Sequence, residues 1–462
     1  MAVDRERISK LNSAPERPDR KYILYWAQMN RRVDANHGLL YAVELANRHN
    51  LPVLYYEGLT CSYKYANDRL HTFILEGVPE TARRLKRAGI GYIFYLRRTT
   101  DAPNHALYDL AQNAAAIVTD DYPTFIARYH NGRVPSKVDI AYYAVDSSCV
   151  VPMKEIPARQ YGAYTIRPKI KRLLPKFLQE PDKLHVKRRF DERAPRFHTE
   201  VTEKNIAELV ASCEIDHSIA PSISFRGGRA AAEKLLEIFL EQNLRRYALA
   251  RNEPSEHATS DLSPYLHFGQ ISALEIALAV QAYAQQHKLI PDEYLEELIV
   301  RRELAFNYAA NVEEPENLEN LPDWCQENMR KHARDKRDPC YTPAQLQRAE
   351  TYDELWNATQ KEMLIRGKIH GYYRMYWGKK IIEWCRTYQE ALDTMVDIHG
   401  WYALDGRDPN TYTNILWCFG LHDRPWPERP IFGKMRYMSL EGMKGKTDTA
   451  AFIEEIRRLE KS

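Results

Sequence analysis

Two tryptophans stand at a spacing that would bring their side chains to one face of a helix. Trp377 and Trp384 are seven residues apart, with Ile381 between them on the same face. Seven residues make two helical turns, a rise of roughly 10 Å. An indole is oxidised more readily than an aliphatic side chain, so indoles close to one another can pass an electron through a protein. Taken alone, however, the spacing favours a stripe of core side chains.

A second group of residues is suited to binding phosphate. The loop Ser222–Gly228 precedes a predicted helix, and glycines before a helix N-terminus expose backbone N–H groups that can bind a diphosphate. Ser260 and Ser263, before the next helix, can add hydroxyl donors. An ordinary loop with a helix cap is the favoured interpretation as long as nothing else points to a ligand. The candidate contacts in the loop are Ser224, Gly227 and Gly228.

Two acidic positions have a structural interpretation beside any chemical one. Asp408 precedes Pro409, which is typical of an N-cap followed by the first residue of a helix. Glu297 stands four residues before Arg301, the spacing of an ion pair on a helix surface. Charge alone therefore does not identify an active site here.

The elements that must position these residues begin with an α/β domain. Residues 21–150 alternate short apolar strands with helical stretches, which predicts a doubly wound parallel sheet. Gly89 stands where a helix end needs a left-handed residue. No G-x-G-x-x-G sequence follows the first strand, so the usual dinucleotide site is not predicted. The strands are expected at Tyr22–Trp26, Pro52–Tyr56, Ile90–Leu96, Ala115–Thr119 and Val138–Val145, and the helices near 36–49, 69–88, 104–114 and 123–130.

The rest of the chain is predicted to be a tail, a linker and an all-α domain. Residues 1–20 are typical of a polar tail. Residues 151–200 carry six prolines and many Lys and Arg, which predicts a long linker between domains. Helical spacing dominates 201–462. Helices are expected over Arg229–Leu249, Asp292–Ala310 and Thr449–Glu460, with capping boxes at Ser272 and Thr351.

Composition limits the class of protein. The 462 residues suggest two or three domains, and 44% hydrophobic with 28% charged residues is typical of a globular protein. A net charge of +3 neither requires nor excludes nucleic acid. Lys and Arg gather at Arg167–Arg172, at Lys187–Arg189 and after Arg424, where a solvated surface is the alternative.

The cysteines and the apolar segments indicate the compartment. Seven dispersed cysteines without a CxxC pair predict reduced, mostly buried thiols. No apolar run is long enough to span a membrane, and the start has no apolar core of a signal peptide. A cytoplasmic protein is therefore expected.

Four segments resemble one family. Their order and spacing across 220–440 are similar to the FAD-binding half of DNA photolyases and cryptochromes. The third and fourth segments are characteristic of class II cyclobutane pyrimidine dimer photolyases, and the α/β half resembles the antenna domain of that family. The segments are Leu262–Ser272, Gly371–Trp377, Leu404–Asn410 and Gly433–Met438.

The resemblance implies that the helical domain binds FAD bent into a U. Arg374 and Asp405 are then expected beside the isoalloxazine ring, where a carboxylate can accept from a ring N–H. The same site is expected to include Leu262, Ser263 and Asp408. A second chromophore of deazaflavin or folate type in the antenna domain is left open.

The tryptophans gain a role from the same resemblance. In class II members a third indole, here Trp356, lies between Trp377 and Trp384 and completes an electron-transfer chain. The resemblance thus implies that light reduces the bound FAD through these three side chains.

A pocket for damaged double-stranded DNA is also implied. A pyrimidine dimer must be flipped out of the duplex to meet the flavin. Glu297 and Asn252 match polar residues near the dimer, and Met375 and Trp417 match the pocket wall. The positions expected to hold the opened duplex are Arg251, Arg424, Trp426 and Arg436. The family precedent is a monomer that uses neither a membrane nor a metal.

Four positions depart from the family pattern. His399 takes the place of an asparagine expected near flavin N5, where a histidine can donate a hydrogen bond and is expected to titrate near neutral pH. Phe306 replaces an expected Asp, and Asn36–Gly38 replaces an expected Asn-Trp-Ala. The loop Trp417–Asp423 is one residue shorter than the family's.

Three functions follow from these patterns. The first is an enzyme, a light-driven photolyase that uses FAD to split cyclobutane pyrimidine dimers, a carbon–carbon lyase reaction. The second is a cryptochrome-type photoreceptor that keeps FAD and the tryptophans without repair. The four departures motivate it, and the short segment after the last predicted helix counts against it. The third, repair of (6-4) photoproducts, is disfavoured by the class II pattern.

Overall fold

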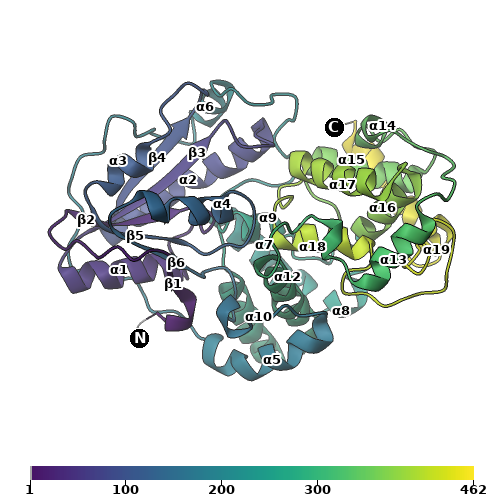
Figure 1. The fold of residues 1–462 in the computed structure, drawn as a ribbon, viewed down its shortest axis with the longest axis horizontal. Coiled ribbons are helices and arrows are strands. Elements are labelled where there is room, and N and C mark those ends of the chain that lie inside the picture. Colours follow the sequence, from purple (N-terminus) through teal and green to yellow (C-terminus); the bar gives the residue numbers. More distant parts are fainter. Residues whose placement is uncertain (1–2, 462) are drawn as a thin grey trace.

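The computed structural model describes residues 3–461, which form an α/β part and a helical part (Figure 1). Residues 1, 2 and 462 lie outside the described residues. They are the first two residues of the predicted tail and the last residue of the predicted helical domain.

A six-stranded sheet forms the centre of the α/β part, in the order β1-β6-β5-β2-β3-β4. Neighbouring strands are parallel except β1 and β6. Apolar side chains pack on both faces, which is why the strands read as continuous apolar runs. The predicted doubly wound sheet and its five strands are confirmed. The strands are β1 (Ile8–Lys10), β2 (Tyr22–Ala27), β3 (Val53–Thr60), β4 (Gly91–Arg97), β5 (Ala114–Asp120) and β6 (Ala141–Val145).

β1 lies inside the segment predicted to be a polar tail, and that prediction is wrong for residues 5–10. Three residues are too few to give a periodic signal in the sequence. The segment is held by Arg7, whose buried guanidinium donates to the carbonyl groups of Asp146, Cys149 and Val150 at 3.2, 2.9 and 2.7 Å. The expected tail therefore provides the antiparallel edge of the sheet.

Helices cover both faces of the sheet. Two of them begin at asparagine N-caps, where Asn36 accepts from the N–H of Leu39 and Asn67 from that of Leu70. The helix after Asn67 ends at Gly89, whose φ of +78° confirms the predicted left-handed position. The helices are α1 (His37–His49), α2 (Asp68–Ala88), α3 (Ala106–Ala111) and α4 (Phe125–Arg133).

The segment predicted to be a linker contains a helix, α5 (Ala163–Phe177). Its prolines, Pro168 and Pro175, suggested an irregular conformation. Both prolines are exposed, and each removes only one backbone hydrogen bond, from a carbonyl group of an exposed residue. The buried side chains of Ile166 and Ile170 compensate by packing into the hydrophobic core.

The helical part contains no strand within residues 146–461, as predicted. The predicted long helices at Arg229–Leu249 and Asp292–Ala310 each contain a π-helical turn, η4 (Phe239–Asn243) and η6 (Glu296–Arg301). The other helices are α6 (Ile206–Ala211), α7 (Arg229–Ile238), α8 (Tyr247–Ala250), α9 (Ser263–His267), α10 (Ala273–His287), α11 (Asp292–Leu295), α12 (Arg302–Ala310), α13 (Asp323–His332), α14 (Pro343–Gln347), α15 (Glu354–Arg366), α16 (Gly371–Trp384), α17 (Tyr388–Tyr402), α18 (Pro409–Cys418), α19 (Leu440–Lys444) and α20 (Thr449–Leu459).

The two predicted capping boxes have different outcomes. The box at Ser272 is present at the start of α10. The box at Thr351 is wrong, because Asp353 is the N-cap of α15 and accepts from the N–H of Trp356. The hydroxyl of Thr351 instead bonds to Asn357 at 2.8 Å.

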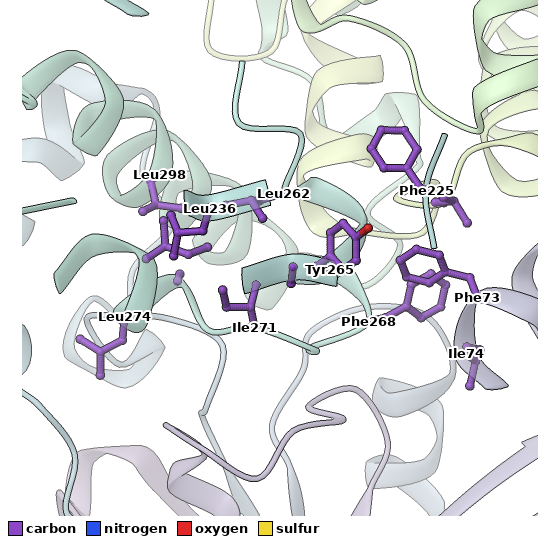
Figure 2. Close-up of a cluster of buried hydrophobic side chains, with 14 of the residues drawn as sticks. Phe73, Ile74, Phe225, Leu236, Leu262, Tyr265, Phe268, Ile271, Leu274 and Leu298 are labelled. Atoms are coloured by element: carbon purple, nitrogen blue, oxygen red, sulfur yellow. The ribbon is translucent and has the colours of Figure 1, made fainter. Parts of the chain in front are cut away.

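One hydrophobic cluster joins the α/β part to the helical part. Figure 2 shows Phe73 and Ile74 of α2 near Tyr265 and Phe268, which lie in and just after α9. The ring of Phe73 is 5.3 Å from that of Tyr265 and 5.2 Å from that of Phe268, measured between centroids. The helical part is therefore packed against the sheet domain as well as connected to it by the chain.

The cysteines and the helices agree with the expectations from composition. All seven thiols are free and six of them are buried, with Cys340 exposed. Among the helices described between residues 3 and 461, none combines the length and the apolar character needed to cross a bilayer.

Candidate active site

Three buried indoles form a continuous row in the helical part. Trp356 of α15 stacks parallel to Trp377 of α16, with 6.3 Å between ring centroids and 4° between planes. Its other neighbour is Trp384, at 5.4 Å and 72°. All three rings are at most 1% exposed. The structure thus brings together the three tryptophans named from the sequence, and Trp356 lies between the other two.

Hydrogen bonds fix two of the three indoles. Nε1–H of Trp356 donates to the carbonyl of Trp377 at 3.0 Å, and Nε1–H of Trp377 donates to Oε1 of Gln360 at 2.8 Å. Trp384 is held by ring contacts, with Tyr341 at 5.3 Å and Tyr352 at 5.7 Å between centroids. The three indoles are therefore part of the packed core. They are also oxidisable rings in contact with one another.

At the other end of the row, Trp377 meets His399 of α17. The two rings are 4.8 Å apart at 90°. Nδ1 of His399 is 2.9 Å from the carbonyl of Met395, so Nδ1 carries the proton and donates. Nε2 is buried and has no hydrogen-bond partner among the described residues. In this tautomer Nε2 is an acceptor.

The expectation that His399 titrates near neutral pH and donates from its free nitrogen is therefore wrong. Burial, together with the positive charge of Arg374, holds the pKa of His399 well below its usual range. A neutral imidazole whose Nδ1–H is already used can only accept at Nε2. The site thus presents an acceptor next to Trp377.

Arg374 and Asp405 form a buried ion pair next to this histidine. Nη2 of Arg374 is 3.2 Å from each carboxylate oxygen of Asp405, and Nη1 is 3.5 Å from the hydroxyl of Thr411. Burial would raise the pKa of Asp405, but the charges of Arg374 and Lys368 outweigh burial and the pKa lies below its usual value. Asp405 is therefore ionised at neutral pH.

Several polar atoms around Asp405 lack partners. Nε of Arg374, Nε2 of His399 and Oγ of Ser263 are buried and form no hydrogen bond within residues 3–461. Ser263 and His399 lie close enough to Asp405 to affect its pKa. A buried donor or acceptor without a partner costs about 1–3 kcal/mol, so a polar ligand bound here would recover this cost.

Sequence reasoning missed a second ion pair in this region. Nζ of Lys368 lies 2.7 Å from Oδ1 of Asp261, which stands between the two candidate serines Ser260 and Ser263. Burial lowers the pKa of Lys368, but the charges of Asp261, Glu362 and Asp405 raise it above its usual value. The acidic residue between two serines was the signal that could have pointed to this pair.

The N–H groups of Gly227 and Gly228 are already used within the protein, so the predicted role of these two residues in a phosphate cradle is wrong. The N–H of Gly227 donates to Glu76 at 2.6 Å and that of Gly228 to Gln270 at 2.8 Å. A Cβ at Gly227 would lie 1.8 Å from the carbonyl oxygen of Phe73, so glycine is needed for close approach to α2. Ser224 in the same loop is exposed.

Two further predicted cofactor contacts have structural roles. Asp408 is the N-cap of α18, and its other oxygen accepts from the hydroxyl of Tyr122 at 2.9 Å and lies 3.4 Å from His267. The predicted cap is confirmed, while its contact with a cofactor stays a prediction. The side chain of Leu262 is buried in the hydrophobic cluster of Figure 2, so only its backbone is left for a ligand.

Glu297 lies on the π-helical turn η6 and pairs with Arg251. The distance from Nη1 of Arg251 to Oε1 of Glu297 is 2.6 Å, and both side chains are half-exposed. The ion pair with Arg301 that the spacing suggested is not the one formed, because the π turn changes the i, i+4 geometry. Asn252, next to Arg251, is exposed. Glu297, predicted to lie near the lesion, is thus paired with Arg251, predicted to hold the duplex.

The two side chains predicted to form a pocket wall, Met375 and Trp417, are half-buried. Met375 packs against the core cluster that contains the indoles. The guanidinium of Arg301 lies 5.6 Å from the ring centroid of Trp417. Arg301 also lies 3.5 Å from Glu296, with which it forms an ion pair in place of the expected one with Glu297.

Of the positions predicted to hold the duplex, Arg424 and Arg436 both contact Trp426, whereas Arg251 does not. The guanidinium carbons of Arg424 and Arg436 lie 5.4 and 5.3 Å from its ring centroid. Nε1–H of Trp426 donates to Asp423 at 3.3 Å, and its backbone N–H donates to the carbonyl of Lys434 at 2.8 Å. The segment after α18 therefore places two cations and an aromatic ring together.

Comparison with known proteins identifies the family. Residues 23–187 match the DNA photolyase family model. The chain is 37% identical over 467 aligned positions to deoxyribodipyrimidine photo-lyase of Methanothermobacter thermautotrophicus, covering 99% of each chain. It is 34% identical to the protein of the same name from Arabidopsis thaliana, over 95% of this chain and 89% of that one. The chain belongs to the photolyase/cryptochrome family.

Solved structures of the photolyase/cryptochrome family share the fold. A class III photolyase from Agrobacterium tumefaciens superposes with a TM-score of 0.67 at 16% identity, covering 95% of this chain and 86% of that one. The cryptochrome of Synechocystis superposes with a TM-score of 0.66 at 14% identity, covering 95% and 99%. This likeness confirms the predicted fold class.

Two departures from the expected photolyase pattern have clear packing roles. Phe306 is fully buried, with its ring 5.3 Å from that of Tyr122 and the guanidinium of Arg302 at 4.4 Å. Asn36 caps α1, and a side chain at Gly38 would approach the ring of Tyr25 to 3.0 Å. The residues at both positions thus pack against side chains of the α/β domain.

Proposed function

We propose that the chain is a class II-type DNA photolyase that uses FAD and light to split cyclobutane pyrimidine dimers. The observation that carries the proposal is the row of three indoles that ends at His399 and the Arg374–Asp405 pair. The class II segments in the sequence and the photo-lyases at 34–37% identity support it.

The residues around Asp405 fit a flavin. Arg374, His399 and Ser263 each have a buried polar atom without a partner, and the ionised Asp405 can accept from a ring N–H. Ser260, Ser263 and the Lys368–Asp261 pair would hold polar parts of the same cofactor. When bound, FAD supplies the light absorption and the electron that the reaction needs.

The indoles provide the route by which the protein supplies electrons. Trp377 lies nearest to the candidate flavin residues, Trp356 bridges, and Trp384 is the outer member. Closely packed rings shorten each transfer. Their burial keeps water away from the oxidised indole.

The lesion pocket is assigned to the side of Glu297, Arg251, Met375 and Trp417. Arg251 holds the carboxylate of Glu297 in position until a dimer enters. A dimer flipped from the duplex would place its apolar faces against Met375 and Trp417, while Arg424 and Arg436 hold the opened strands. The enzyme is proposed to act as a monomer.

The decisive experiment measures repair directly. The purified protein, loaded with FAD and chemically reduced, is mixed with DNA that carries one thymine dimer and is then illuminated. Restored thymine, measured by chromatography and absent in darkness, is the expected result. A protein that binds FAD and is photoreduced but restores no thymine would contradict the proposal.

A second candidate, a cryptochrome-type photoreceptor, is favoured by one observation. His399 presents an acceptor at a position where the class II pattern has an asparagine, which can both donate and accept. Photoreduction through the indoles without repair would support this alternative.

A light-harvesting chromophore of deazaflavin or folate type stays a prediction for this chain. The solved photolyase of Sulfolobus tokodaii contains two FAD molecules, with the implication of a novel light-harvesting cofactor in that protein.

A further inference from the structure

Helix α5 is fixed directly beside the candidate lesion pocket. Arg167 donates twice to Glu296, at 3.0 and 2.7 Å, and Glu296 is the neighbour of Glu297 on η6. On the other side, Nδ1 of His422 donates to the carbonyl of Tyr161 at 2.9 Å, two residues before Arg424. The segment before and within α5 is therefore bonded at one end to the loop after α18 and further along to the π turn η6.

The outer face of α5 carries exposed aromatic and basic side chains. Tyr161 is 70% exposed and Tyr164 is 73% exposed. Lys171 and Arg172 follow Tyr164 by seven and eight residues, so they lie two turns further along the same face, and both are exposed. We call these four residues the α5 surface.

The charge of this segment is entirely positive. The sequence from Ile156 to Gln179 contains no Asp or Glu. Most of its basic side chains have partners: Arg167 bonds to Glu296, Lys169 to Gln160 and Lys176 to Glu6.

Lys171 and Arg172 differ from these neighbours. Neither forms an ion pair with any residue in the described part of the chain. Both lie on α5, which the two bonds from Arg167 to Glu296 hold against η6. The charge of Lys171 also helps to lower the pKa of Glu296, after that of Arg167. Two exposed cations on a helix packed against η6 are thus left without an ion-pair partner among the described residues.

We propose that the α5 surface binds the phosphate backbone of the duplex that flanks the lesion. The proposal rests on the proposed function, because it needs DNA at the neighbouring pocket. Lys and Arg, and the hydroxyl groups of tyrosines, are common donors to phosphate oxygens. The two turns from Tyr164 to Lys171 span roughly 10 Å, about three base-pair rises of 3.4 Å. The α5 surface would thus extend the length of duplex that the protein contacts on one side of the lesion, without recognising the bases.

The test removes the two free cations and compares them with a matched pair. The double variant K171A/R172A is measured against K86A/R87A, which removes an exposed Lys-Arg pair at the end of α2. Binding to a dimer-containing duplex is followed by fluorescence anisotropy over a salt series. The logarithm of the binding constant is plotted against the logarithm of the salt concentration. The slope for K171A/R172A should be shallower by about 1.8, because each lost phosphate contact removes about 0.9. The slope of K86A/R87A should equal that of the unmodified protein.

Duplex length tests the placement. Duplexes extended on only one side of the dimer are compared, and one of the two extensions should strengthen binding to the unmodified protein but not to K171A/R172A. Retained flavin absorbance of the double variant shows that it is folded. Y164F, which removes one hydroxyl donor, gives a smaller loss on the same extension.

The possible outcomes separate this proposal from the proposed function. An unchanged slope, or an equal change in K86A/R87A, overturns the α5 assignment while repair stands. If the molecular mass of the unmodified protein in solution rises with its concentration, and that of K171A/R172A does not, the α5 surface is a self-association surface and the assignment is overturned. A protein that binds no duplex at all overturns both proposals.

Discussion

At the scale of single residues, Trp356 decides whether the indoles form a route. Along α16, Trp377 and Trp384 are two turns apart, roughly 10 Å in rise, and neither ring touches the other. Trp356 comes from α15 and contacts both, at 6.3 and 5.4 Å between centroids. The sequence spacing alone therefore could not show the route, because its middle member lies on another helix.

Replacing Trp356 by phenylalanine should interrupt this route. Phe fills most of the space but is much harder to oxidise, so we expect W356F to slow photoreduction of bound FAD at least ten-fold. The lost Nε1–H bond to Trp377 costs about 1 kcal/mol of stability, so the variant should fold. Absorbance of the flavin under constant illumination measures the rate. W324F, on α13, is the control, and unchanged photoreduction in W356F would remove Trp356 from the route.

His399 gives a prediction about pH. Burial and the charge of Arg374 hold its pKa well below the usual range, so it stays neutral through the neutral region. We expect the photoreduction rate to show no step near pH 6.5, the ordinary histidine value. The rate is measured in small pH steps for the unmodified protein and for H399N. A step near that pH that disappears in H399N would show that His399 titrates there.

At the scale of elements, Asn328 of α13 holds the backbone of the loop that carries Trp426 and Arg436. Nδ2 of Asn328 donates to the carbonyl of Phe432 at 2.9 Å, and its Oδ1 accepts from the N–H of Lys434 at 2.6 Å. Between them, Gly433 has a φ of +49°, and a Cβ there would lie 2.0 Å from Oδ1 of Asn328. Both the conformation and the close approach require glycine at this position.

G433A should therefore displace the loop that carries Trp426 and Arg436. We expect binding of damaged duplex to weaken about ten-fold or more, with a loss of stability of about 1–3 kcal/mol, while the flavin spectrum is retained. G132A, where a Cβ meets nothing within 4 Å, is the matched control. Undiminished binding by G433A would show that the loop does not hold the DNA.

The elements themselves were largely predictable from the sequence. Five strands and four helices of the α/β part follow from period and turn residues, and Asn36, Asn67 and Gly89 act as ordinary caps. What failed were features set by tertiary contacts. β1 depends on the buried Arg7, α5 tolerates two exposed prolines, and the π turns have no signature in the residue spacing.

At the scale of the whole molecule, the site depends on contacts between parts that are distant in sequence. The Arg374–Asp405 pair and the indole row come from two helices, α15 and α16, and a loop, and only the resemblance to a family grouped these residues beforehand. For Gly227 and Gly228 the local sequence pattern predicted binding of phosphate. In the structure their N–H groups instead bond to Glu76 and Gln270. In the site and in the glycine loop alike, the role of each residue depends on its neighbours in the folded structure, which residue spacing does not give.

Glu303 links the two parts of the molecule and makes stability depend on pH. Its carboxyl group on α12 accepts from the N–H groups of Val150 and Val151, at 2.6 and 3.1 Å, just after β6. Burial raises the pKa of Glu303 from 4.5 to about 8, against the opposing effect of these bonds. The folded protein therefore keeps a proton that the unfolded chain releases. This contribution to stability is complete below about pH 4.5 and is lost as the pH rises through about 8.

E303Q should remove this pH dependence. Glutamine keeps the oxygen that accepts both bonds but does not titrate, so the variant should lose less stability between about pH 5 and 8 than the unmodified protein. The difference is at most about 5 kcal/mol, from 3.5 pH units at 1.36 kcal/mol each. Urea unfolding at stepped pH measures it, with a constant m value as the check on two-state behaviour. E208Q, an exposed position on α6, is the control. If the free energy of unfolding depends on pH in the same way for E303Q and the unmodified protein, Glu303 does not keep its proton in the folded protein.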